Sequence, residues 1–147
     1  IENLFKAAKE SNIKLYGVSG YRSYQRQKKI FESNVREEGS EKEANKYSAR
    51  PGESEHQTGL AIDVTSRSVN FYLTQKLGEI KEGKWLEENA HKYGFIIRYP
   101  EGKQKITGYI YEPWHLRYVG TEVANRIAKE NITFEEYLDV NAVGKAQ

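Results

Sequence analysis

The chain has 147 residues, of which 37% are hydrophobic and 30% are charged, and its formal net charge is +2. This composition excludes a disordered chain and is typical of a folded globular protein. We expect residues 1–147 to form a single domain around one hydrophobic core. Because basic and acidic residues are interleaved and nearly balanced, we expect no nucleic-acid partner.

Missing residue types exclude further classes of protein. The chain contains no cysteine, which rules out a disulfide scaffold, a thiolate zinc site and a cysteine nucleophile. No apolar run reaches the ~18 residues that cross a bilayer, so we expect no membrane span. The chain also lacks methionine. Ile1 is therefore not expected to be the natural start, and any signal peptide or anchor is expected upstream of it.

Apolar spacing and turn residues predict helices that alternate with short strands in the first third of the chain. The predicted elements are a helix over 2–11, a strand over Lys14–Ser19, a helix from Ser23 to about Glu38, and a helix over Glu41–Ser48. In the second helix, the spacing predicts that Tyr24, Phe31 and Val35 face inward. Gly39 is expected to end that helix.

The rest of the chain continues the alternation. The predicted elements are a loop over 50–59, a strand over Leu60–Thr65, a helix over Lys84–Tyr93, strands over Phe95–Tyr99 and Leu116–Val119, and helices over Thr121–Glu130 and Thr133–Leu138. In the first of these strands, Leu60, Ile62 and Val64 are expected on the core face, with Ala61 and Asp63 on the other face. Together the elements predict an α+β fold, with a small, mainly antiparallel sheet and helices packed against it.

The first candidate metal ligands lie in and after the predicted loop. His56 belongs to a glycine-bearing loop, and Asp63 lies on the non-core face of the strand that follows. Gly59 would allow a tight turn, so that His56 and Asp63 converge.

A second histidine lies near a carboxylate in the segment 112–115 (EPWH). Residues three apart in a regular strand point to opposite faces. Glu112 and His115 can therefore share a site only if the backbone bends, and Pro113 is a plausible cause. His91 has no comparable acidic motif and is interpreted as a surface residue.

Two imidazoles and one carboxylate would supply three ligands and leave a fourth position for water, as in a catalytic zinc site. Nitrogen and oxygen ligands suit zinc, although iron or another divalent ion would also fit. Glu112, close to His115, is the candidate general base for the attacking water. The alternative is that each histidine and carboxylate form an ordinary surface or capping pair. Two such pairs among only three histidines favour the metal site.

These residues resemble the signature of a known family. The pattern S-x-H-x-x-G-x-A-x-D over residues 54–63, followed by E-x-x-H over 112–115, is similar to that of the VanY-type D-Ala-D-Ala carboxypeptidases. That family is grouped with lysostaphin-like enzymes and the hedgehog signalling domain. Residues 20–27 (GYRSYQRQ) and 112–118 (EPWHLRY) also resemble it, so the likeness extends from about Ser19 to Val119. Within the family, the sequence most resembles the LdcB-type L,D-carboxypeptidases.

The resemblance implies a hedgehog-like and D-Ala-D-Ala-peptidase-like fold, with zinc on His56, Asp63 and His115 and with Glu112 as the base. It also implies that the substrates are peptidoglycan stem peptides ending in D-Ala, and that the protein acts outside the cytoplasm. We expect a monomer. LdcB-type enzymes act on a tetrapeptide stem and VanY-type enzymes on a pentapeptide, and the sequence leaves this choice open.

A carboxypeptidase must bind a terminal carboxylate and stabilise an oxyanion, and arginine suits both tasks. The family likeness places Arg22 in the cleft, so we expect it to take one of these catalytic or binding roles. Gln27 and Ser54 are expected to hydrogen-bond the substrate terminus. The alternatives are that Gln27 is an ordinary helix-surface residue and that Ser54 only shapes its loop. Arg50 either contacts the substrate or is a solvated loop charge.

Two other functions remain open from sequence. One is an endopeptidase that cuts within peptidoglycan cross-links with the same site chemistry. The other is a non-catalytic wall-binding or signalling module that retains zinc. An intact Glu112 argues against the second, because a site that only binds has no need of a base.

Overall fold

The computed structural model describes residues 1–138. A four-stranded sheet lies at its centre, with the strand order β1-β2-β4-β3 and antiparallel pairing throughout. The strands are β1 (Tyr16–Ser19), β2 (Ala61–Thr65), β3 (Phe95–Tyr99) and β4 (Glu112–Tyr118). The predicted α+β class with a small antiparallel sheet is therefore confirmed.

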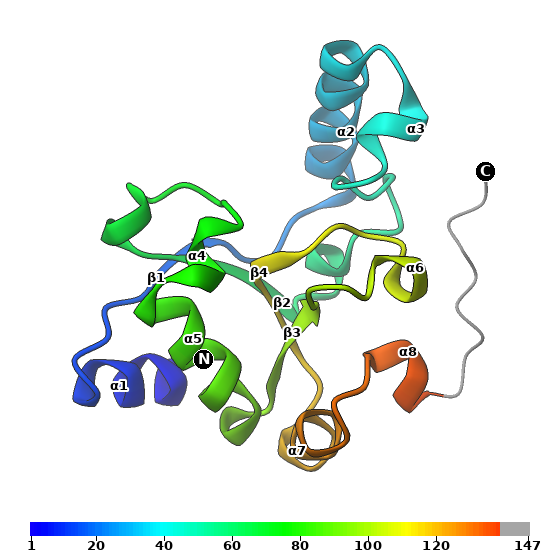
Figure 1. Cartoon of the computed structure of the whole chain (residues 1–147). Helices are drawn as coiled ribbons and strands as arrows, with labels where there is room; N and C mark the ends of the chain where they lie inside the picture. Colours follow the sequence, from blue (N-terminus) through cyan, green and yellow to red (C-terminus); the bar gives the residue numbers. More distant parts are fainter. Residues whose placement is uncertain (139–147) are drawn as a thin grey trace.

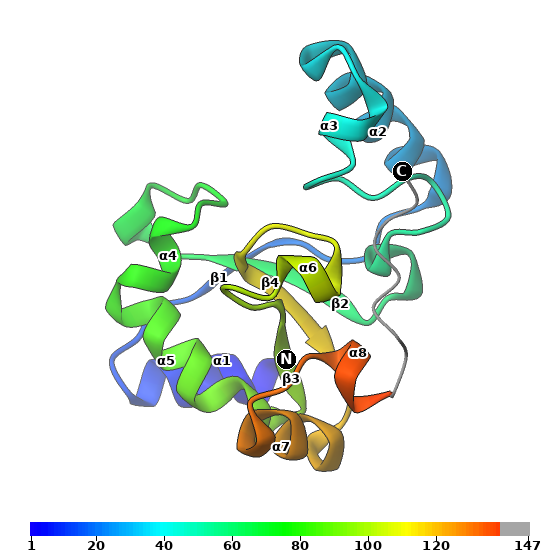
Figure 2. The same cartoon turned by 45° about the vertical axis from the view of Figure 1, so that its right-hand side comes forward.

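Short helices surround this sheet (Figure 1). They are α1 (Glu2–Glu10), α2 (Tyr24–Glu38), α3 (Glu41–Ala44), α4 (Lys76–Glu79), α5 (Lys81–Asn89), α6 (Gln104–Thr107), α7 (Thr121–Glu130) and α8 (Phe134–Tyr137). The 3-10 turns are η1 (Glu55–Thr58), η2 (Arg67–Val69) and η3 (Ala90–Tyr93). In both whole-chain views, α2 and α3 lie together at one end of the molecule, away from α1, α5 and α7 (Figure 2).

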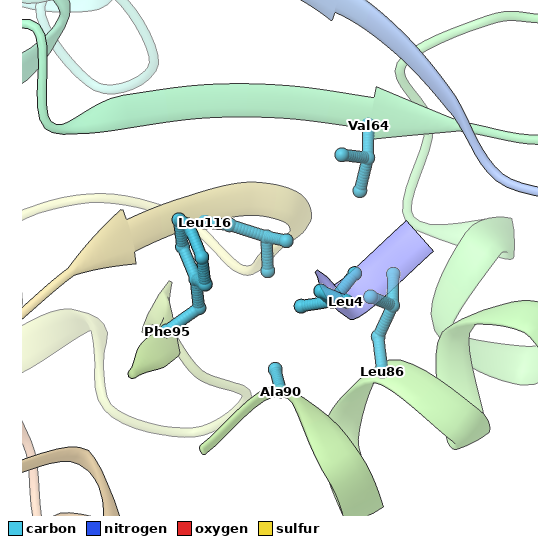
Figure 3. Packing of buried hydrophobic residues seen from close by; sticks show 6 residues of the cluster. All are labelled: Leu4, Val64, Leu86, Ala90, Phe95 and Leu116. Carbon is cyan, nitrogen blue, oxygen red and sulfur yellow. The ribbon is translucent and has the colours of Figure 1, made fainter. Parts of the chain in front are cut away.

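One face of the sheet forms the main core with α1 and α5 (Figure 3). Its buried residues are Leu4, Val64, Leu86, Ala90, Phe95 and Leu116. Side chains alternate between the two faces of a strand. The residues directly before Val64 and Leu116, which are Asp63 and His115, therefore point to the opposite face. The apolar packing of one face thus fixes which residues face the other.

A second apolar cluster holds the C-terminal helices against β3. Ile96 packs with Ala124 and Ile127 of α7, and Phe134 of α8 joins the same cluster. The Thr133 side chain accepts a hydrogen bond from the backbone of Glu136, and the Glu136 side chain accepts one in return, which forms a capping box. This confirms the predicted start of the last helix.

Two predictions of inward-facing residues were wrong. Leu60 is 41% exposed and precedes β2, whereas Ala61 is only 3% exposed. Asp63 and Val64 point to opposite faces of β2 and both are buried, so both faces of this strand are covered and simple alternation of polar and apolar residues does not apply. Tyr24 is 51% exposed, and the buried positions of α2 are Gln27 and Phe31.

Several predicted element boundaries also differ. Helix α3 ends at Ala44 instead of Ser48, and α5 begins at Lys81, earlier than the expected Lys84. The short helices α4 and α6 were not predicted, because four residues carry no readable helical period. Strand β4 begins at Glu112 instead of Leu116, because pairing with β3 continues past Pro113. Within residues 1–138, no helix has both the length and the apolar character needed to span a membrane.

Candidate metal centre

Asp63 and His115 face each other directly across the paired strands β2 and β4. His56 reaches the same point from η1, the turn that precedes β2. All three residues are buried, with exposed fractions of 4% for His56, 4% for Asp63 and 6% for His115. Each offers one ligand atom, and these three atoms lie within 4.8 Å of one another. The structure therefore brings together the three residues that the sequence singled out as metal ligands.

The pairing of β3 with β4 is irregular around Pro113, and Glu112 lies beside this cluster. Ile97 of β3 pairs with Leu116 of β4, and Tyr99 pairs with Glu112, so β4 has more residues than β3 between these two pairs. This irregular register changes the direction in which Glu112 points. Glu112 is 5% exposed, and its Oε2 lies 3.8 Å from His115 Nδ1.

The two histidines are oriented through the ring nitrogens that face away from Asp63. Nδ1 of His56 lies 2.8 Å from the Gly20 carbonyl oxygen, and its Nε2 lies 3.3 Å from Asp63 Oδ2. Nε2 of His115 lies 3.2 Å from Glu55 Oε2, and its Nδ1 lies 3.3 Å from Asp63 Oδ1. If each outer nitrogen donates its proton to these acceptors, both inner nitrogens present lone pairs to the centre.

This arrangement fits a divalent metal ion. Among the described residues, Oδ1 of Asp63 is buried and accepts no hydrogen bond. A carboxylate that faces two imidazole lone pairs is repelled by them unless a cation lies between. Two nitrogen ligands and one oxygen ligand, without thiolate, form a set that zinc prefers.

The electrostatics of the site favour a bound cation. Burial alone would raise the pKa of Asp63, but the neighbouring His115 and His56 lower it to about 2. Burial alone would lower the pKa of His115, but Asp63 and Glu55 together raise it to about 9. The carboxylates thus remain ionised and attract positive charge, whether a proton or a metal ion.

Arg22 is held beside the cluster by a buried hydrogen-bond network. Its Nη1 donates to Gln27 Oε1 at 2.8 Å and its Nη2 donates to Ser19 Oγ at 2.9 Å, while Nη2 lies 3.8 Å from Asp63 Oδ2. Gln27 is 1% exposed, and its Nε2 donates to the Ala49 carbonyl oxygen at 2.6 Å. The alternative that Gln27 is an ordinary surface residue is therefore wrong.

A cleft of about 360 Å³ lies over these residues. Besides the cluster, its lining includes Tyr47, Ser54, Leu73, Tyr109, Ile110 and Trp114. Ser54 is 7% exposed and its side chain makes no capping hydrogen bond to η1, which it precedes.

Two residues with open interpretations lie outside this cleft. Arg50 is not part of the lining, and its Nη2 lies 3.7 Å from Glu41 Oε2 in an exposed ion pair. His91 is also outside the site, where its Nδ1 pairs with Asn125 Oδ1 at 2.7 Å.

Sequence reasoning missed residues that surround the cluster. Glu55 lines the cleft and contacts His115, and the Tyr99 ring lies 5.0 Å from the His115 ring. Burial raises the pKa of Tyr99 well above its usual value. The position of Glu55 directly before His56 was the one available signal. In a chain with 21 acidic residues, that signal is weak.

Comparison with known proteins agrees with this geometry. The VanY family model, described as D-alanyl-D-alanine carboxypeptidase, matches residues 1–121. The chain belongs to this family. It is 53% identical to YodJ of Bacillus subtilis over 139 residues, which cover 95% of this chain and 50% of that protein. It is 37% identical to a D-alanyl-D-alanine carboxypeptidase of Enterococcus faecalis over 147 residues, or 95% and 53% of the two chains. The chain thus spans about half the length of these relatives.

Solved structures of the family share the fold. The LdcB LD-carboxypeptidase is 54% identical, with a TM-score of 0.88 over 94% of this chain and 64% of that one. VanYB in complex with D-alanine-D-alanine is 37% identical, with a TM-score of 0.82 over 94% and 77%. A VanY variant in complex with Zn(II) is 37% identical, with a TM-score of 0.81 over 93% and 78%. These likenesses confirm the expected D-Ala-D-Ala-peptidase-like fold.

The bracing of Arg22 leads to a stability prediction. We expect Gln27→Ala to lower the free energy of unfolding by about 1–3 kcal/mol, because it leaves Nη1 of the partly buried Arg22 and the Ala49 carbonyl oxygen without their partner. Gln25, exposed on the same helix, provides a matched control, and Gln25→Ala should change stability by less than about 0.5 kcal/mol. Chemical denaturation measures both. Equal effects of the two substitutions would contradict the bracing role.

Proposed function

We propose that this chain is the catalytic domain of a zinc-dependent carboxypeptidase that removes the C-terminal D-alanine from peptidoglycan stem peptides. The observation that carries the proposal is the convergence of His56, Asp63 and His115 next to Glu112 at the base of a cleft. Family membership supports the same reaction class. Since its substrate would be the cell wall, the protein would act outside the cytoplasm.

In this proposal, Nε2 of His56, a carboxylate oxygen of Asp63 and Nδ1 of His115 would hold the zinc ion. When bound, zinc supplies Lewis acidity and makes water acidic enough to react near neutral pH. The related VanY variant in complex with Zn(II) supports the choice of metal.

Glu112 is the proposed general base. It would take a proton from the attacking water as the water oxygen bonds to the scissile carbonyl carbon. The C–N bond then breaks, and Glu112 would return the proton to the amine of the departing D-alanine. The carboxylate of Glu112 faces the same side of His115 as Asp63, so it lies on the side where water would approach.

Arg22 is the proposed partner for the oxyanion or for the terminal carboxylate. Its guanidinium is fixed by Ser19 and Gln27, so little conformational entropy is lost when it binds an anion. Both ends of the Gln27 amide are already engaged, which favours a bracing role over direct contact with substrate. Ser54 remains the candidate for a hydrogen bond to the substrate, because it lines the cleft and does not cap its own helix.

A tetrapeptide stem is the favoured substrate within this class. The solved LD-carboxypeptidase LdcB is 54% identical to this chain, compared with 37% for VanYB. The pentapeptide reaction remains an outcome that a product assay would reveal. Mass spectrometry of defined tetrapeptide and pentapeptide muropeptides distinguishes the two reactions, because it shows which of the two stems loses one D-alanine.

Replacement of the base should separate chemistry from metal binding. We expect Glu112→Gln to reduce turnover by ~10²–10⁴-fold, because the attacking water loses its proton acceptor. Zinc content and thermal stability should stay close to those of the wild type. Glu122→Gln is the matched control, since it removes an exposed carboxylate on α7, away from the cleft, and should leave turnover unchanged. Near-normal turnover in Glu112→Gln would mean that another group accepts the proton.

The requirement for a free C-terminal carboxylate tests the carboxypeptidase assignment. Matched stem peptides with free and amidated C-termini should differ in rate by about 10–100-fold, because loss of the anion that pairs with the partly buried Arg22 costs roughly 1–3 kcal/mol. We expect Arg22→Ala to remove this preference, and Arg26→Ala, on the exposed side of α2, to retain it. Equal cleavage of both peptides by the wild type would indicate an endopeptidase instead. A preserved preference in Arg22→Ala would show that another group binds the carboxylate.

A further inference from the structure

Glu55 occupies a buried position next to the candidate metal centre but outside the ligand set. Its side chain is 14% exposed, and its Oε2 lies 3.2 Å from Nε2 of His115. The cluster that meets metal-ligand spacing contains His56, Asp63 and His115 and does not include Glu55. Glu55 therefore touches a proposed ligand from the side that faces away from the metal.

Two arginines hold the other oxygen of Glu55. Arg98 Nε donates to Oε1 at 2.8 Å, and Arg117 Nη1 lies 3.0 Å from the same atom. Arg98 and Arg117 come from neighbouring strands, β3 and β4. Their positive charges lie against this oxygen and stabilise the ionised carboxylate. Fixed in this way, Glu55 has one oxygen directed at His115.

Arg98 also links this group to the C-terminal helix α8. Its Nη1 and Nη2 donate to the two carboxylate oxygens of Glu135 at 3.0 Å and 2.6 Å. Arg98 is 12% exposed and Glu135 is 17% exposed, so water screens this bidentate pair only partly. A chain of charged contacts thus runs from α8 through Arg98 and Glu55 to His115.

The geometry points to Glu55 as the positioning residue that orients His115 for the metal. Its carboxylate accepts the Nε2 proton of His115, so the Nδ1 lone pair faces Asp63 and the metal. Arg98 and Arg117 fix that carboxylate, and Glu135 fixes Arg98. The inference rests on the proposed metal site, and it adds a role for residues outside the ligand set.

The other proposed histidine ligand provides an internal comparison. His56 is oriented by a neutral acceptor, the Gly20 carbonyl, whereas His115 is oriented by a carboxylate. A charged acceptor makes the imidazole a stronger donor to the metal and fixes its tautomer more firmly. His115 is thus the ligand whose basicity depends on a side chain that substitution can remove.

Zinc affinity tests this role without any measurement of turnover. Competition with a chromophoric chelator should show that Glu55→Ala binds zinc ~10–100-fold more weakly than the wild type, as substitutions of such orienting partners do. Glu55→Gln keeps an acceptor oxygen and should recover most of the lost affinity. Glu82→Ala is the matched control, because Glu82 is also a buried carboxylate, 5% exposed, but lies on α5 and pairs with Ser68. It should bind zinc as tightly as the wild type.

A measurement on the zinc-loaded wild type decides the question even if Glu55→Ala does not fold. Two-dimensional ¹H–¹⁵N spectra of the histidine rings should show His115 protonated at Nε2 with Nδ1 bound to the metal. Metal on Nε2, or a proton on Nδ1, would overturn the inference, and so would wild-type zinc affinity in folded Glu55→Ala. If the wild type itself binds no zinc, the proposed function fails as well, so the two failures can be told apart.

Discussion

The buried carboxylate of Asp63 is the constraint on which the rest of the site depends. It lies in an inner strand of the sheet, 4% exposed, with an imidazole nitrogen 3.3 Å from each of its oxygens. A buried charge of this kind is unfavourable unless positive charge is held against it. The nearby guanidinium of Arg22, 3.8 Å away, supplies part of that charge. A cation between Asp63 and the two histidines would supply the rest of the positive charge.

The two faces of the sheet have different roles, because one packs the hydrophobic core and the other carries the candidate metal site. One face carries the apolar cluster that α1 and α5 cover, and the opposite face carries Asp63 and His115. Because these two candidate ligands belong to paired strands, their positions are set by the same hydrogen-bonded register that holds the core. Of the three candidate ligands, only His56 is positioned by the loop before β2. The backbone N–H of Arg22 donates to the His56 carbonyl oxygen at 3.0 Å and helps to fix this loop.

Sequence reasoning pointed to the candidate ligand cluster because its signals are local and chemical. A histidine in a glycine-bearing loop, an aspartate on the following strand and a proline between Glu112 and His115 are such signals. The structure shows the convergence of the three side chains and an irregular strand register around the proline. The charged network around Glu55 was not predicted. Its members are spread from residue 55 to residue 135, and contacts over such sequence separations leave no periodic pattern. For the same reason, the burial of Gln27 and the exposure of Leu60 became visible only in the folded chain.

The central claim is that one metal ion lies between Asp63 and the two histidines. X-ray diffraction data collected on both sides of the zinc absorption edge, from crystals grown with zinc, test it directly. The account predicts one anomalous peak in this cluster, ~2.0–2.2 Å from His56 Nε2, an Asp63 oxygen and His115 Nδ1. Crystals with no anomalous peak between these three side chains would contradict it.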